Sequence, residues 1–213
     1  MDRALEIAQL GEAARASFDE KHRAREVMIA ASRVAIQSCA ASIRATHRGE
    51  FDNAEVLARK ARESIREADA ALSGHPDVRT NGPLNDAKKE LAEAWLTLAL
   101  VRDERLPTPG DLGVDVAPYC NGLAEAASEL RRQLLDRLRA GDLSRAETLM
   151  GAMDEIYGLL VSVDYPDGVT GGLRRTTDAL RAVLERTRGD LTTAMVAARL
   201  QGAIEQAREA GDA

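Results

Sequence analysis

The sequence predicts an all-α protein, because its composition and its hydrophobic spacing both favour helices. Hydrophobic residues make up 45% of the 213 residues and aromatic residues only 3%, so the apolar content is mostly Ala, Leu, Val and Ile. Ala, Leu and the abundant Glu and Arg are good helix formers, whereas strands prefer β-branched and aromatic residues. No alternating strand pattern and no hairpin signal is found. We expect one elongated helical domain that covers residues 1–213.

The first expected helix is unusually long. Apolar residues recur at three- and four-residue spacing over residues 3–46, with no proline among them. A helix of about 40 residues is too long to be covered within one small bundle. It indicates an elongated bundle or an interface between copies of the chain.

Six further helices follow, separated by glycine and proline signals. Pro83 suits the first turn of the third helix, and the side chain of Asp142 can cap the fifth. We expect residues 103–115 and 164–168 to be loops and Gly189 to begin the last helix. The expected helices after the first cover residues 51–73, 83–102, 116–140, 142–163, 169–188 and 189 onward.

Charge and cysteine content exclude several classes of protein. The net charge of −6 argues against a protein that coats duplex DNA non-specifically, although a basic groove can lie on an acidic protein. Cys39 and Cys120 imply no disulfide framework. Neither a leader peptide nor an apolar run of about 18 residues is present, so we expect a cytoplasmic protein without membrane contact.

The usual catalytic motifs are missing. The sequence has no P-loop, no Gly-x-Gly-x-x-Gly, no Cys-x-x-Cys and no His-Glu-x-x-His motif. Its histidines, His22, His47 and His75, are scattered, and we expect each to be a solvated side chain. Zinc chemistry and a histidine-based triad are therefore not indicated.

Two acidic pairs are the candidate site. Glu90 and Glu93 share one face of the third helix, and Glu125 and Glu129 share one face of the fourth. The loop between these helices is short enough for antiparallel packing, which would bring four carboxylates together. Carboxylates at short range repel one another and raise each other's pKa, and a hard cation such as Mg²⁺ or Mn²⁺ offsets that repulsion. A metal ion held in this way can activate water against a phosphodiester.

A solvated acidic face is the other interpretation of the same spacing, since such pairs are common on helices. One observation favours the site. The residues around Glu90 and Glu93 make the third helix apolar over much of its circumference, so the glutamates are expected to point partly inward. These residues are Leu91, Ala94, Trp95 and Leu98.

Several short motifs resemble the Trax branch (translin-associated factor X) of the translin family. The segment KELAEA at residues 89–94 is similar to the first acidic segment of that branch, and GLAEAASEL at 122–130 to the second. Their order and spacing match over about residues 10–190. Further similar segments are HRGEF at 47–51, YPDGVTGGLRR at 165–175 and the Arg-Gly pair at 188–189.

The resemblance implies a seven-helix bundle that assembles into a hollow homo-oligomer, typically an octamer, around RNA. It also implies a Mg²⁺-dependent endoribonuclease acting on single-stranded RNA, with single-stranded DNA as a further ligand. The implied catalytic and metal-binding residues are Glu90, Glu93, Glu125 and Glu129. In this hypothesis Glu90, Glu93 and Glu129 are ligands, and Glu125 is a ligand or the base that orients the water.

The sequence departs from the family pattern at two places. Glu125 stands where the family carries Asp, so its carboxylate reaches one methylene further. Upstream of Glu90, only Arg79 remains of the basic residues that contact RNA in translin subunits. Other candidate RNA contacts are Lys88, Lys89, Arg174 and Arg175. The basic N-terminal extension of eukaryotic Trax is also missing, which indicates a prokaryotic homologue that assembles with itself.

Three functions therefore remain open from the sequence. The first is the metal-dependent endoribonuclease inside a closed shell. The second is a non-catalytic shell that binds RNA or single-stranded DNA, and the third is a helical interaction protein with neither property.

Overall fold

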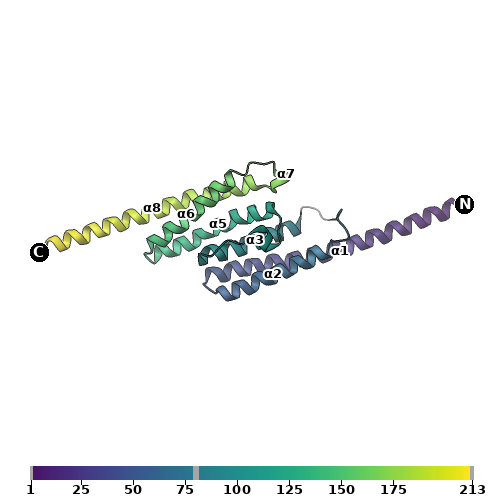
Figure 1. Ribbon diagram of the computed structural model, residues 1–213, viewed down its shortest axis with the longest axis horizontal. Helices are drawn as coiled ribbons and strands as arrows, with labels where there is room; N and C mark the ends of the chain where they lie inside the picture. The colour runs from purple at the N-terminus through teal and green to yellow at the C-terminus, as the bar shows by residue number, and fades with distance from the viewer. Residues whose placement is uncertain (1, 79–81, 212–213) are drawn as a thin grey trace.

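A computed structural model describes residues 2–78 and 82–211. Over these residues the chain forms six long helices and two single helical turns, without a strand (Figure 1). The elements are α1 (Arg3–His47), α2 (Phe51–Ala71), α3 (Pro83–Arg102), α4 (Pro109–Leu112), α5 (Val116–Arg139), α6 (Leu143–Val161), α7 (Asp167–Thr170) and α8 (Leu173–Gly211).

The long helices form two groups that meet at α3 and α5. The helices α1, α2 and α3 pack on one another, and so do α5, α6 and α8. The contact between α3 and α5 joins the groups, and the main core cluster draws residues from both. The middle of the molecule is therefore the α3–α5 pair, which carries both acidic segments.

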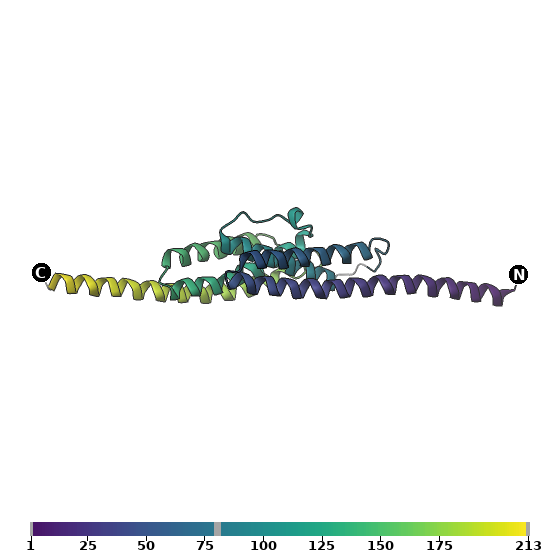
Figure 2. The same cartoon turned by 90° about the horizontal axis from the view of Figure 1, so that it is seen from below.

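Two helices extend well beyond this packed body, in opposite directions (Figure 2). The first buried residue of α1 is Met28, and the last buried residue of α8 is Leu191. The extension of α1 nevertheless carries large apolar side chains that are exposed, among them Leu10 and Phe18. The described part of the chain does not cover these side chains. This agrees with the apolar spacing that predicted a first helix too long for one small bundle.

The all-α class is confirmed, and Pro83 and Asp142 lie at the helix starts that the sequence predicted. Pro83 opens α3, and a carboxylate oxygen of Asp142 accepts a hydrogen bond of 3.1 Å from the backbone N–H of Arg145. None of the helices in the described ranges is long and apolar enough to span a membrane.

The predicted break at Gly189 is wrong, because this glycine lies inside the continuous helix α8. Leu184 and Leu191, on either side of it, are buried in the core. The Arg188 guanidinium also contacts Asp154 of α6 at 2.6 Å. These interactions outweigh the roughly 1 kcal/mol by which glycine disfavours a helix.

Single helical turns replace parts of the two predicted loops. In α4, Thr108 and Asp111 form a reciprocal capping box, with Pro109 in the first turn. Proline and acidic residues that indicate a loop are also those that start a helix, and this accounts for the difference.

Candidate metal centre

Helix α3 places Glu90 and Glu93 toward the interior because it is covered on most sides. It packs on α1, α2 and α5, and most of its residues from Leu84 to Ala99 are buried. Glu93 is only 8% exposed, and Glu90 is half-buried. The apolar circumference of α3 thus has the consequence expected from the sequence, and Glu93 is a buried carboxylate.

Gly122 lets α5 approach α3 very closely at this level. A Cβ atom at Gly122 would lie 2.6 Å from the backbone oxygen of Lys89 and 2.9 Å from the backbone nitrogen of Glu93. Any larger residue would therefore push the helices apart. Glu125 follows Gly122 by one turn of α5, so the close approach brings its carboxylate to the acidic residues of α3.

Three of the four predicted glutamates form one compact group. Glu90, Glu93 and Glu125 each offer a carboxylate oxygen, and these oxygens lie within 4.8 Å of one another. Glu129 does not belong to this group, although its charge acts on Glu93. The structure thus gathers Glu125 into the group, where the sequence hypothesis counted Glu129 as the third ligand.

Burial and mutual repulsion make the group costly to ionise. Desolvation raises the pKa of Glu93 to about 9, and the charges of Glu90, Glu125 and Glu129 act in the same direction. Burial also raises the pKa of Glu90, which is opposed by the charge of Lys89. Burial raises the pKa of the Cys39 thiol on α1, and the charges of Glu90 and Glu93 act in the same direction.

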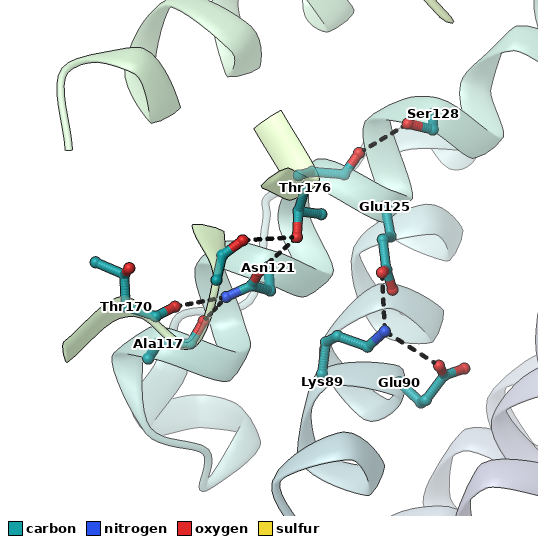
Figure 3. Close-up of polar contacts among 10 residues, drawn as sticks. Lys89, Glu90, Ala117, Asn121, Glu125, Ser128, Thr170 and Thr176 are labelled. Carbon is teal, nitrogen blue, oxygen red and sulfur yellow. Dashed lines mark hydrogen bonds and ion pairs between the residues drawn. The ribbon is translucent and has the colours of Figure 1, made fainter. Parts of the chain in front are cut away.

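Lys89 places a positive charge directly against the group (Figure 3). Its Nζ donates a hydrogen bond of 2.8 Å to Oε1 of Glu125 and lies 3.5 Å from Oε1 of Glu90. Burial lowers the pKa of this ammonium, but the hydrogen bond to Glu125 and the nearby carboxylates outweigh it, and the pKa is raised overall. Lys89 therefore bridges α3 and α5 as a charged residue.

His47 also belongs to the site, although its sequence context predicts only a solvated histidine within the family-like segment HRGEF at 47–51. It is buried at the end of α1, and its Nε2 lies 2.6 Å from Oε2 of Glu129. Gln133 Nε2 lies 3.3 Å from the other ring nitrogen, Nδ1. Because an amide nitrogen can only donate, Nδ1 accepts and Nε2 carries the proton that is donated to Glu129. The expectation that His47 is solvated is wrong, because only 3% of its side chain is exposed. Its partners are 82 and 86 residues away in the sequence, so no local pattern indicates them.

Next to Gly122, Asn121 fixes α7 and the start of α8 against α5 (Figure 3). Its Nδ2 donates to the backbone oxygen of Thr170 at 2.8 Å, and its Oδ1 accepts from the hydroxyl of Thr176 at 2.7 Å. Buried polar groups that are fully hydrogen-bonded rigidify their surroundings. The first turns of α5 are thereby held against α7 and α8.

The predicted RNA contacts have different environments. Arg79 lies outside the described residues. Lys88 is only 3% exposed, and its Nζ lies 3.1 Å from Asp69 and 3.6 Å from Asp115, so it serves an internal ion pair and is not presented on the surface. Arg174 is exposed and paired with Asp164, and Arg175 is exposed.

The donor set fits a hard divalent cation. Three carboxylates with converging oxygens, one of them buried at an electrostatic cost, are the ligand type that Mg²⁺ and Mn²⁺ prefer. No histidine or cysteine belongs to the group, which argues against zinc.

Comparison with solved structures identifies the family. The structure of an AfC3PO–duplex RNA complex is similar over 87% of this chain and 96% of that chain, with a TM-score of 0.80 and 33% identity. This chain belongs to the translin/C3PO family. A second AfC3PO crystal structure matches 87% of this translin-like chain and 97% of its own length, with a TM-score of 0.78 and 32% identity.

Two further similarities are more distant. Apo-NeC3PO has the same fold, with a TM-score of 0.69 and 19% identity over 91% of this chain and 98% of that chain. An uncharacterized protein of Methanocaldococcus jannaschii is 29% identical over 175 residues, which are 81% of this translin-like chain and 77% of that protein. No family model matches the sequence.

Proposed function

We propose that this translin-like protein is a metal-dependent endoribonuclease that acts on RNA inside a closed homo-oligomeric shell. The observation that carries the proposal is the convergence of Glu90, Glu93 and Glu125 within 4.8 Å. Electrostatic repulsion alone would keep three carboxylates apart, yet here they converge and one of them is buried. A bound divalent cation removes this conflict.

The chain's own residues divide the work of such a site. Glu90, Glu93 and Glu125 would hold Mg²⁺ or Mn²⁺, and His47 would hold Glu129 beside them in one orientation. The ion, when bound, would supply activation of water and stabilisation of charge on a phosphoryl oxygen. Glu129 is exposed enough to meet a water or a sugar–phosphate backbone, since 37% of its side chain is accessible.

RNA as the ligand is supported by the relative that was solved with duplex RNA. A closed oligomer is supported by the exposed apolar residues on the projecting part of α1. Single-stranded RNA remains the proposed substrate, as the resemblance to the Trax branch implies. Duplex RNA belongs in every assay as a second substrate.

The test is cleavage of end-labelled RNA with Mg²⁺, with Mn²⁺ and with EDTA. Wild-type protein should form products only with a divalent ion, and Glu93→Ala should abolish them while helicity and oligomeric mass stay unchanged. Glu67→Ala, which removes an exposed carboxylate of α2, is the matched control and should cut normally. Undiminished cleavage by Glu93→Ala would remove the site assignment.

A second candidate is a shell that binds RNA or single-stranded DNA without cutting it. The ammonium of Lys89 favours it, because this residue already neutralises part of the acidic group. It predicts binding that survives EDTA, and no products with either metal ion.

A further inference from the structure

Lys89 contacts the oxygens that the proposed metal ion would need. Its ammonium lies 2.8 Å from Oε1 of Glu125 and 3.5 Å from Oε1 of Glu90, on two different helices (Figure 3). Both carboxylates belong to the group that converges within 4.8 Å. Lys89 thus serves as a counter-ion inside the candidate site itself.

An ammonium and a divalent cation cannot both bind these carboxylate oxygens tightly. Both are positive, both need the carboxylate lone pairs, and their repulsion is strong at such short range in a half-buried site. A lysine side chain has four flexible methylenes and a compact charge, so it can leave one partner and reach another. Occupation of Glu125 by a metal ion would therefore release the Lys89 ammonium.

The neighbouring Lys88 shows by contrast why Lys89 can respond. Lys88 is buried against Asp69 and Asp115, away from the glutamates. Lys89 keeps 26% of its side chain exposed and stands at the open edge of the group, where Glu90 and Glu125 are also partly exposed. A released ammonium at that edge faces whatever phosphate lies over the site.

We propose that Lys89 is the internal counter-ion of the metal-free site and becomes an RNA phosphate contact only when a divalent cation has taken Glu90 and Glu125. This proposal rests on the proposed function, because it requires both the metal site and an RNA ligand. It couples the two, so that part of the RNA affinity depends on bound metal.

The first experiment compares wild-type protein and Lys89→Met for RNA affinity in EDTA and in Ca²⁺, with gels to confirm that the RNA stays intact. The two proteins should bind equally in EDTA, where the ammonium is held by carboxylates. In Ca²⁺ the variant should bind roughly tenfold more weakly, the usual effect of losing one charge-assisted contact. Lys60→Met, which removes an exposed lysine of α2, should match wild type in both conditions.

The second experiment measures Mn²⁺ affinity by calorimetry without RNA. Lys89→Met should bind Mn²⁺ more tightly than wild type, because the competitor is gone. Lys89→Arg keeps a cation against Glu125 and should show no gain. Circular dichroism checks the fold of each variant, and Lys89→Gln repeats both comparisons with a neutral side chain that still donates a hydrogen bond.

The results distinguish a failure of this proposal from a failure of the proposed function. Equal loss of RNA affinity with and without Ca²⁺ would overturn the proposal, since Lys89 would then already be available. Weaker Mn²⁺ binding by Lys89→Met and Lys89→Gln would also overturn it. If wild type and the Lys89 variants bind Mn²⁺ equally well, only this proposal is overturned. If wild type does not bind Mn²⁺ at all, the proposed metal site is overturned as well.

Discussion

Nε2 of His47, at the end of α1, lies 2.6 Å from Oε2 of Glu129 on α5, and the amide of Gln133 occupies the opposite ring nitrogen. The imidazole is held from both sides and can donate to Glu129 in only one tautomer. A hydrogen bond of this kind fixes the orientation of a carboxylate that lies beside a candidate metal group, without contact to the ion. His47 thus brings α1 into a site otherwise made by α3 and α5.

His47→Ala should weaken Mn²⁺ binding, because Glu129 loses its fixed orientation beside the acidic group, where its charge acts on Glu93. The loss should be smaller than the roughly 10- to 100-fold that is usual for residues supporting a direct ligand, since Glu129 is not one of the three converging carboxylates. Calorimetry with Mn²⁺ measures the effect. His22→Ala removes an exposed histidine of the same helix and should leave binding unchanged, and equal binding by the two variants would contradict a role for His47.

Glu93 should make the metal-free protein less stable as pH rises. Its pKa is about 9 in the folded state against an ordinary 4.5, so the folded chain holds this proton more tightly than the unfolded chain does. The contribution of the protonated Glu93 to the free energy of unfolding is complete below pH 4.5. It is lost as the pH rises toward 9, at up to about 1.4 kcal/mol per pH unit.

Glu93→Gln should therefore stabilise the metal-free protein at pH 8 and change little at pH 4.5. Urea unfolding in EDTA at both pH values gives the two differences. A stability difference that is the same at both pH values would show that Glu93 ionises normally. Added Mg²⁺ should stabilise the wild type at pH 8 but not the variant.

Gly122→Ala should destabilise the fold by about 1–3 kcal/mol, the usual effect of overpacking a core. The added methyl group would collide with the backbone of α3 at Lys89 and Glu93. Thermal unfolding measures the change, and Mn²⁺ affinity should fall with it because Glu125 moves away. Gly151→Ala on α6 is the control of opposite sign, since nothing lies within 4 Å of its Cβ position and alanine favours a helix.

The protein should form a particle many times heavier than its 23.0 kDa chain. Light scattering measures that mass, and a value near one or two chains would contradict a closed shell. Phe18→Glu, on the exposed apolar stripe of α1, should reduce the mass by placing a charge in the proposed interface. Val56→Glu, an exposed apolar residue of α2 within the packed body, should leave it unchanged.

Local signals were enough to predict the helices and the acidic pairs. The helix starts at Pro83 and Asp142 follow from their own chemistry, and the inward direction of Glu93 follows from the apolar residues around it. Gly189 misled the prediction because packing on both sides outweighs its weak propensity. A local signal says where a helix can end, and only the tertiary contacts decide whether it does.

Long-range partners could not be predicted in this way. Nothing near His47 in the sequence indicates that it meets Glu129, and nothing near Lys89 indicates that its ammonium would cross to Glu125. The inclusion of Glu125 rather than Glu129 in the compact group depends on the rotation of α5 against α3. That rotation is set by a close contact at Gly122, whose effect requires knowing both helices.

The projecting part of α1 can also be regarded as a spacer of defined length. Residues 3–20 lie before Lys21, whose ammonium pairs with Asp77 of the packed body, and at 1.5 Å per residue they form a rod of roughly 27 Å. In an assembly joined through these rods, the separation between neighbouring acidic groups would follow from the number of residues in them. Inserting two helical turns would widen the chamber of the proposed shell and leave each acidic group intact, so the size of RNA admitted to it would change while the proposed chemistry would not.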